Sequence, residues 1–569
     1  METVNVEMQN LTLGSGPVCN NDSDVNKPCK NSGKLACTNC LLVTYCGKTC
    51  QVAHWPTHRQ DCKSSLMKKT WAPSWVTQNR TPEFMTGGPP QAVFGARKYL
   101  WGNVPAIDVI RMGQNEGVDF QGPINLLFAA SGDIRNTILS IANLPPTYHG
   151  PLNVTINDRE IDIVARNVIF LLAFFVEEDS ITASEHVLHI WYSALLTEPC
   201  SSLLYRKLKP FIEDICIKIA KKPASTLLGK TWRFGESSLR LVLTRDSWFS
   251  LLGYFDVPQG LGRETAQYVR QGVVSAPKRV DYVDRQMCMM SPSARLGMAK
   301  FRQDGILLPF GQPRGAFTTP NPTMFQSSQW PMMDNADPVS GWSLKLLLEF
   351  DAGPASNDVY GKLYHYLKSL FTGFHCRLRS GRIAFDIFHV DAWLLPGSLA
   401  NNHFDRIDVG NICDNGYIGI ELTLKTFGPL LQPSSISPHA TLVTLFLNAV
   451  AEMRMMADNL TPFLGRQVPG LYHVNSIKRI AALNLLYDMD QHFNLYMDIE
   501  DFAEVALGAG VERKTTHTII DAWPMRFSCG RPTLKAKADF SLLLSSSHTG
   551  QERFVEWKLI SGTAVEDVS

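Results

Sequence analysis

The sequence lacks a long apolar run. The longest unbroken run, Val168 to Val176, has nine residues, whereas a helix that crosses a bilayer needs about 20. The first residues, Met1 to Glu7, are acidic and have neither the basic stretch nor the apolar core of a secretory signal. These absences predict a chain that has no membrane span and resides inside the cell, in the cytoplasm or the nucleus.

The sequence also lacks an excess of charge of either sign. Its 54 Lys and Arg residues face 53 Asp and Glu residues, a net charge of +1. Such a chain has no strong long-range field, which argues against a surface built as a whole to bind nucleic acid or anionic lipid. Because 45% of the residues are hydrophobic, disorder is excluded as the dominant state.

Cysteine is sparse except at one place. Seven of the 13 cysteines lie within residues 19–62. In a chain without a secretory signal, this clustering indicates thiolates held by metal and not a disulfide framework. The other six are scattered among apolar neighbours, and we predict that they are small core residues. These are Cys200, Cys216, Cys288, Cys376, Cys413 and Cys529.

The spacing within this cluster is typical of zinc ligands. Cys37-x2-Cys40 has the knuckle spacing that lets two thiolates bind one ion, and Cys46-x3-Cys50 forms a second pair. One helical face presents residues that are four apart, as His58 and Cys62 are. Closed structural sites use four protein ligands and leave no position for a reactive water. We therefore predict two structural zinc ions, held by Cys19, Cys29, Cys37, Cys40, Cys46, Cys50, His58 and Cys62.

This segment resembles the MYND-type zinc finger. The match is Cys29-x7-Cys37-x2-Cys40-x5-Cys46-x3-Cys50-x7-His58-x3-Cys62, with Gln51-x3-Trp55 in the last part. The resemblance implies interleaved ligands: Cys19, Cys29, Cys46 and Cys50 for one ion, and Cys37, Cys40, His58 and Cys62 for the other.

The match departs from the family at the first pair, which is normally Cys-x2-Cys. Here position 26 is Asn, and the nearest upstream thiol is Cys19. His54, four residues after Cys50, is the rival fourth ligand. We favour Cys19 because thiolates dominate such sites.

The resemblance also implies a function. MYND fingers recognise short proline-containing peptides through a groove near the residues that match Gln51 and Trp55. The alternative is that Trp55 only packs beneath the second zinc site. Residues 19–69 carry eight Lys and Arg against three Asp, a local charge of +5. They have no recognition-helix pattern, so we do not expect nucleic acid as a partner.

From about residue 95 the pattern becomes α/β. Short apolar stretches predict strands at residues 124–130, 152–156, 383–390, 404–409 and 440–447, and an antiparallel pair at residues 540–545 and 554–559. Helices are expected at residues 134–144, 159–176 and 416–431. The helix at 159–176 is apolar nearly all round in its last turns, so we expect it to be buried.

Two resemblances bear on this body. Tyr99 to Asp108 and Ala130 to Asn136 look like a domain of unknown function, found in fungal MYND proteins and at the N-terminus of a dynein axonemal assembly factor. The order of strand, glycine turn, helix, strand and acid is also similar to class I methyltransferases. In that interpretation Gly132, Asp133 and Asp158 would bind the cofactor. The turn has one glycine where the fingerprint has two or three, and Asp133 would equally serve at a helix N-terminus.

These observations predict an organisation in six parts. They are a flexible tail (1–18), the finger (19–62), a linker (63–94), a first α/β half (95–200), a mainly helical and loop-rich insertion (201–345) and a second α/β half (346–569). The fold class is α/β, with a Rossmann-like, methyltransferase-like body. We expect an adaptor or scaffold without catalytic residues. The alternative is an S-adenosylmethionine-dependent methyltransferase.

Overall fold

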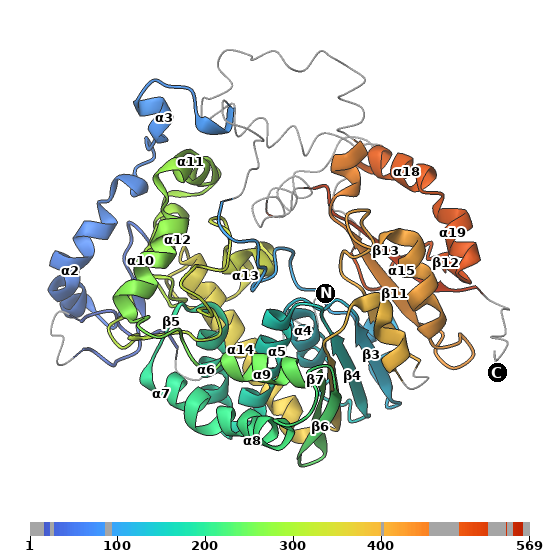
Figure 1. Cartoon of the computed structure of the whole chain (residues 1–569). Helices are drawn as coiled ribbons and strands as arrows, with labels where there is room; N and C mark the ends of the chain where they lie inside the picture. Colours follow the sequence, from blue (N-terminus) through green and yellow to red (C-terminus); the bar gives the residue numbers. More distant parts are fainter. Residues whose placement is uncertain are drawn as a thin grey trace.

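The computed structural model describes residues 16–22, 28–85, 94–399, 403–453, 489–521, 542 and 550–560. In this part of the chain a large mixed sheet organises an α/β body, and a small zinc-finger segment lies at the other end of the molecule from β11 and β13 (Figure 1). Within the same residues, no helix combines the length and the apolar character that crossing a membrane requires.

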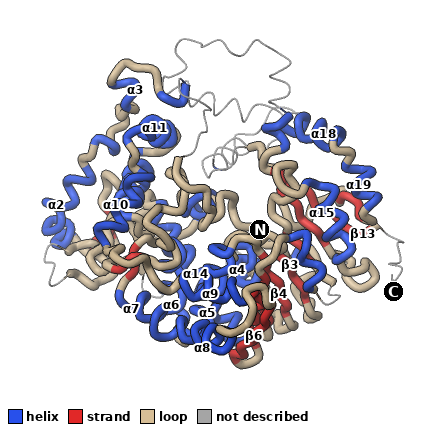
Figure 2. The backbone as a smooth tube through the Cα atoms, in the orientation of Figure 1, coloured by secondary structure: helices blue, strands red, loops and turns tan. Residues whose placement is uncertain are grey.

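The main sheet has nine strands among the described residues, and Figure 2 shows most of them grouped in red. In spatial order they are β12 (Val511–Arg513), β13 (Arg553–Leu559), β11 (Thr441–Phe446), β10 (Arg406–Asp408), β3 (Ile124–Phe128), β4 (Leu152–Asn157), β9 (Ile383–Phe388), β7 (Ser237–Thr244) and β6 (Leu227–Phe234). The strands from β11 to β7 are parallel to one another. β13 is antiparallel to both of its neighbours, and β6 is antiparallel to β7.

The sheet is covered on both faces, because its strands are apolar on both sides. In β3, Leu126 and Phe128 belong to one hydrophobic core and Leu127 to a second one. The first core contains α4, α5, α6 and α14, and the second contains α15, α18 and α19. Successive residues of a strand point to opposite faces, so an uninterrupted apolar run is what a sheet buried on both faces requires.

Helices make up most of the rest of the body. They are α4 (Arg135–Ala142), α5 (Ile161–Val176), α6 (Ser180–Tyr192), α7 (Glu198–Ser202), α8 (Lys209–Ile219), α9 (Arg245–Gly253), α10 (Arg263–Val274), α11 (Val280–Cys288), α12 (Pro292–Asp304), α13 (Leu344–Glu349), α14 (Val359–Ser380), α15 (Gly419–Phe427), α18 (Met489–Ile499) and α19 (Phe502–Gly508). Short helical turns lie at Met112–Gln114, Leu203–Leu208, Pro277–Arg279, Pro338–Gly341, Ala392–Ser398 and Gly428–Leu430, and a small sheet pairs β5 (Leu195–Leu196) with β8 (Thr319–Pro320).

Most of the predicted elements of the body are confirmed. The strands expected near residues 124, 152, 383, 404 and 440 are β3, β4, β9, β10 and β11, and the three expected helices are α4, α5 and α15. α5 is buried from Asp162 to Phe175, as its apolar pattern indicated. The stretch 554–559 is β13, which pairs with β11 and β12; residues 540–545, proposed as its partner, lie outside the described residues apart from Leu542.

Three strands of the main sheet were not predicted: β12 at one edge, and β6 and β7 at the other end. β6 and β7, between residues 227 and 244, extend the sheet beyond β9 from within a segment expected to be helical and loop-rich. Gly235, with φ 62°, makes the turn between them. A signal was present, since a glycine between two runs of alternating side chains is typical of a hairpin.

The scattered cysteines are buried as expected, with one correction. Cys200, Cys216, Cys288 and Cys413 are buried, but Cys376 is exposed on α14. The prediction was wrong there because α14 turns this position away from the core that its neighbour His375 enters. Cys529 lies outside the described residues, as do residues 1–15 of the expected tail and residues 86–93 of the expected linker.

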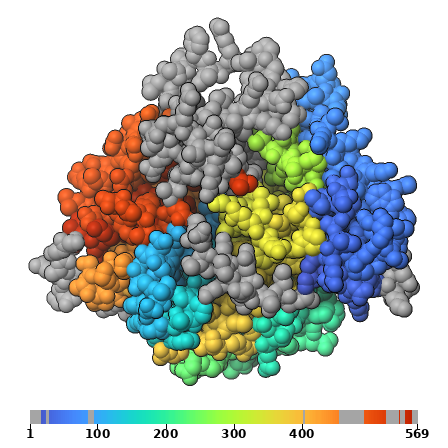
Figure 3. All heavy atoms as spheres, turned by 180° about the vertical axis from the view of Figure 1, so that it is seen from behind, coloured from blue at the N-terminus to red at the C-terminus, as the bar shows by residue number. Residues whose placement is uncertain are grey.

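The finger is short and packs against the body. It consists of β1 (Leu35–Ala36), β2 (Thr44–Tyr45) and α2 (Lys48–Cys62). The chain then runs along α11 and α12 through the turns Ser65–Met67, Ser74–Thr77 and Glu83–Met85. Figure 3 shows this N-terminal part, in blue, lying against the yellow and green surface of the body.

Candidate metal centre

The structure brings eight ligand atoms of the finger together in two groups. One group is Cys19, Cys29, Cys46 and Cys50, and the other is Cys37, Cys40, His58 and Cys62. Within each group all ligand atoms lie within 4.8 Å of one another. The pairs interleave along the chain, as the MYND resemblance implied.

The distances within each group have the size that a tetrahedral zinc site requires. Zinc lies about 2.3 Å from sulfur and about 2.0–2.1 Å from nitrogen, so a regular tetrahedron leaves about 3.8 Å between two sulfurs and about 3.6 Å between sulfur and nitrogen. The Sγ atoms of Cys37 and Cys62 are 3.8 Å apart, and Cys40 Sγ lies 3.5 Å from His58 Nε2. In the other group Cys46 Sγ lies 3.7 Å from Cys29 Sγ and 3.5 Å from Cys50 Sγ. The two groups fit two structural zinc ions.

Local structure explains how so short a segment presents these ligands. His54, His58 and Cys62 form the buried face of α2, because residues four apart lie one above the other on a helix. Cys46 directly follows β2, and Cys50 lies in the first turn of α2. β1 and β2 pair in antiparallel register and close the loop that carries Cys37 and Cys40.

The fourth ligand of the first group is Cys19 and not His54 in this geometry. Both ring nitrogens of His54 already have partners: Nδ1 lies 3.0 Å from the Tyr45 hydroxyl and Nε2 lies 3.3 Å from Asp22 Oδ1. Cys19 is held at the cluster by its own backbone, since Cys19 N donates to Asn31 O at 2.8 Å. Cys19 and Cys29 therefore meet in one cluster although nine residues separate them. This agrees with the weak dependence of the entropy of loop closure on loop length.

The electrostatics of the second group suit a cation. Burial, with a smaller effect from the nearby His54, lowers the pKa of His58 to about 4. The imidazole is thus neutral at pH 7, the form that binds metal. Burial raises the pKa of the Cys40 thiol, so the thiolate needs a cation beside it at neutral pH. His58 Nδ1 is buried and has no hydrogen-bond partner among the described residues, which leaves Nε2 as the nitrogen aimed at the cluster.

The body of the protein holds the zinc knuckle in place. Leu41, which follows Cys40, has a left-handed backbone with φ 54°, an uncommon conformation for a branched side chain. Its carbonyl accepts from Asn357 N at 3.1 Å, and Cys40 O accepts from Ser293 Oγ at 2.8 Å and from Asn357 Nδ2 at 3.3 Å. Leu296 of α12 and Phe310 complete the small core around the cysteines.

No pattern in the sequence indicated this docking, because the body residues that contact the finger lie more than 200 positions further along the chain. Arg295 makes a further contact: its guanidinium donates to Leu66 O and Lys68 O, both at 3.0 Å. The finger is therefore joined to the body by buried hydrogen bonds and a shared core.

Gln51 and Trp55, the expected peptide contacts, lie on α2 outside the zinc clusters. Trp55 is 38% exposed, and its ring meets the His58 ring edge to face at a centroid distance of 5.9 Å. Gln51 is half-buried one turn earlier, and Val52 beside it is 61% exposed. Trp55 thus both packs on a zinc ligand and presents a face to solvent.

The expected cofactor residues of the body lie together at the carboxyl ends of β3 and β4. Gly132 has φ 54°, which favours glycine, and its N–H donates to Asp158 Oδ2 at 2.9 Å. The other oxygen of Asp158 accepts from Glu160 N at 2.9 Å. Asp133 accepts from Gly102 N at 3.0 Å and from Arg135 Nε at 2.6 Å. The carboxylates of Asp133 and Asp158 thus both accept hydrogen bonds from other residues of this chain.

Comparisons with known proteins support the resemblance to the MYND finger and the presence of a domain of unknown function. A family model described as the MYND finger matches residues 18–62, which the geometry above identifies as a two-zinc segment. A second model, for a domain of unknown function (DUF4470), matches residues 100–196, which span β3 to β5. No curated protein and no solved structure matches the chain. The chain is thus a zinc-binding protein that combines a MYND finger with a domain of unassigned role.

Proposed function

We propose that this protein is an adaptor whose finger binds proline-containing peptide segments of other proteins through Gln51 and Trp55. The observation that carries the proposal is the outer face of α2, where Gln51, Val52 and Trp55 lie at spacings of three and four residues. An exposed tryptophan beside an amide is suited to proline-rich segments, which dock on aromatic-lined surfaces as preformed extended helices.

The zinc sites support this surface by making it rigid. α2 carries two ligands on its buried face, His58 and Cys62, and one near its start, Cys50, so binding of the ions fixes the helix that presents Trp55. Because the finger also shares hydrogen bonds and a core with α12, a bound peptide is held at a fixed place on the body. Rigid presentation lowers the entropic cost of binding.

The test uses the full chain loaded with zinc. An array of proline-containing peptides identifies a ligand, and its affinity is measured for Gln51→Ala and Trp55→Ala. Loss of a central tryptophan costs at least about 2 kcal/mol in a binding surface, which is about 30-fold in affinity. The matched control is Trp393→Ala, since Trp393 is 49% exposed at a distant place in the sequence.

Zinc content is measured for each variant, because Trp55 touches the ligand His58. Unchanged affinity in both Gln51→Ala and Trp55→Ala, with two zinc ions retained, removes this face from the proposal. An equal loss in Trp393→Ala would show a general effect on folding.

A methyltransferase is the second candidate, and one observation favours it. The central strands run β9, β4, β3, β10, β11, which is the strand order of doubly wound sheets that bind nucleotides at the point where the order reverses. Gly132 and Asp158 lie just after β3 and β4, at the carboxyl ends of these strands and beside that point. We rank this candidate second because Asp158 and Asp133 already accept hydrogen bonds from the chain itself.

Titration of the purified chain with S-adenosylmethionine separates the two candidates. Micromolar binding that Asp158→Ala abolishes would favour the enzyme, and absence of binding would favour the adaptor. The resemblance of the body to a dynein axonemal assembly factor adds no role to either candidate, since a fold or a shared domain does not carry a function by itself.

A further inference from the structure

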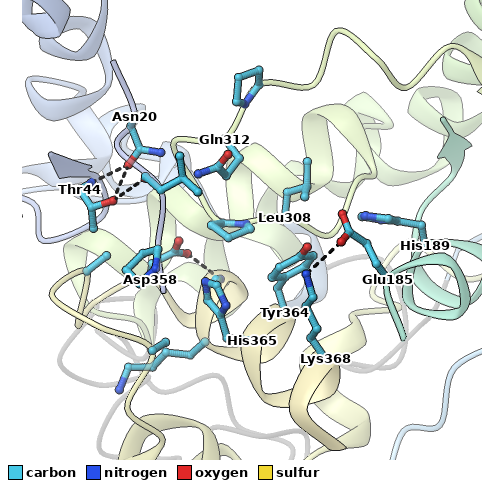
Figure 4. Close-up of a pocket in the computed structure, with 18 of the residues that line it drawn as sticks. Asn20, Thr44, Glu185, His189, Leu308, Gln312, Asp358, Tyr364, His365 and Lys368 are labelled. Carbon is cyan, nitrogen blue, oxygen red and sulfur yellow. Dashed lines mark hydrogen bonds and ion pairs between the residues drawn. The ribbon is translucent and has the colours of Figure 1, made fainter. Parts of the chain in front are cut away.

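A cavity of about 640 Å³ lies where the finger meets the body. Val18, Asn20, Leu42 and Thr44 of the finger form one wall, and α6, α14 and the segment 308–317 form the others. Figure 4 shows Asn20 and Thr44 across the cavity from Glu185, His189 and Lys368. The volume falls in the range of small-molecule sites, about 300–1,000 Å³.

Lys368 supplies a positive charge with unused donors. Its ammonium donates to Glu185 Oε2 at 2.9 Å, and no other acceptor contacts it among the described residues. An ammonium has three donors, so two remain for a ligand. Glu185 is the acceptor of this one bond. The base of the pair therefore keeps donors for a second acceptor.

The second acid of the cavity is also occupied. Asp358 caps α14, and its Oδ2 accepts from Phe310 N at 2.7 Å while its Oδ1 accepts from Gly361 N at 2.9 Å. Its charge therefore lies at the positive end of a long helix and is compensated there.

The histidines of the cavity add hydrogen-bonding groups without charge. Burial lowers the pKa of His189 and of His365 to about 4, so both are neutral at pH 7. His186 also lines the cavity, and its Nδ1 is buried without a partner among the described residues. The remaining lining is largely apolar and includes Pro199, Leu308 and Phe317.

We propose that this cavity binds a small organic anion, a carboxylate or phosphate carried on an apolar body, with the zinc finger as its roof. The anionic group accepts from Lys368, and the apolar body lies against Pro199, Leu308 and Phe317. A cationic ligand would meet the ammonium of Lys368, and the two acids of the cavity already accept hydrogen bonds from Lys368, Phe310 and Gly361. This site is separate from the outer face of α2.

The roof depends on both zinc clusters. Val18 and Asn20 flank Cys19, a ligand of one ion, and Leu42 and Thr44 lie between ligands of both ions, Cys40 and Cys46. Asn20 Oδ1 accepts from Thr44 N, which ties the two parts of the roof together. Removal of zinc therefore opens the cavity. By linkage, a ligand that binds only the closed cavity makes the zinc sites harder to empty.

The first test compares three probes of the same shape on the zinc-loaded full chain: indole-3-acetate, indole-3-acetamide and tryptamine. Affinities are measured by saturation-transfer NMR and calorimetry. Indole-3-acetate is expected to bind at least about tenfold more tightly than the other two, the effect of one charge pair in a partly screened site. Phenyl phosphate then shows whether phosphate or carboxylate is preferred. Equal affinities, tighter binding of tryptamine, or no binding of either anion overturns the proposal.

The second test uses variants. Lys368→Met keeps the apolar stem, and it should weaken indole-3-acetate binding at least about tenfold. Glu185→Gln removes the competing acid and should tighten binding. Lys218→Met is the matched control, because Lys218 also pairs with an acid on a helix but lies on an exposed surface. If Lys368→Met is unstable, the double variant with Glu185→Gln removes both charges and must also lose the preference for the anion. Unchanged binding in these lysine variants overturns the assignment of Lys368.

The third test concerns the roof. Chelation of zinc from the full chain should abolish indole-3-acetate binding while far-UV circular dichroism shows the body still folded. Unchanged affinity in the zinc-free chain would overturn the role of the finger in this site.

Discussion

Replacement of Cys19 separates the two possible ligand sets of the first zinc site. Cys19→Ser removes one thiolate from a group whose four ligand atoms all lie within 4.8 Å of one another. Loss of an outer-shell partner already costs 10–100-fold in metal affinity, so loss of a direct ligand should cost at least about 100-fold, or about 2.7 kcal/mol. Native mass spectrometry should find one zinc ion in place of two, and a colorimetric chelator should remove that ion first.

His54→Ala is the matched variant, because His54 is the rival ligand and is equally buried. It loses the hydrogen bond to Tyr45 and the contact with Asp22. We expect a loss of unfolding free energy of about 1–3 kcal/mol with both zinc ions retained. Two zinc ions in Cys19→Ser together with one in His54→Ala would refute the assignment.

Three further predictions concern stability. Arg295→Ala removes the guanidinium that donates to the partly buried carbonyls of Leu66 and Lys68 and should lower the free energy of unfolding by about 1–3 kcal/mol in urea titrations; full stability would contradict the docking of residues 65–68 on α12. Phe310→Ala removes a side chain that is 5% exposed in the core of the finger. It should cost about 3–5 kcal/mol and speed hydrogen exchange in α2, whereas unchanged exchange would argue against a shared core. His189 has a folded pKa of about 4 against 6.5 in the unfolded chain, so the unfolded state binds more protons between these values and stability falls as pH is lowered from 6.5 to 4. His189→Gln should reduce this slope by up to about one proton in denaturation measured across that range, and an unchanged slope would contradict the assignment.

The zinc ligands could be predicted from the sequence because a structural zinc ion needs four Cys or His ligands at characteristic spacings. Two thiolates three or four residues apart, and an imidazole and a thiolate four apart on a helix, reach one ion in few conformations. The buried strands and α5 could also be predicted, because their composition leaves no side that faces the solvent. β6 and β7 were missed although their alternation around Gly235 is a hairpin signal, because most of the surrounding segment is helical. Cys376 was misplaced because exposure on α14 depends on how the helix is rotated against its neighbours.

From the sequence, ligand chemistry favoured Cys19, but His54 stayed a rival because both lie within reach of the first cluster. The choice depends on Tyr45 and Asp22, which engage the two nitrogens of His54, and on the backbone bond that holds Cys19. Likewise, the glycine turn and the two acids suggested a cofactor site, and only the fold shows that these acids bond to backbone groups and to Arg135.

By itself the sequence determined that this chain binds zinc through a finger and has an α/β body, because ligand chemistry and hydrophobic patterning act over a few residues. Only the tertiary structure decided how the finger joins the body and that a cavity with Lys368 at its side lies between them. Glu185 and Lys368 are 183 residues apart and lie on different helices. No local pattern records that two such helices pack side by side, since their contact is the outcome of burying the whole core.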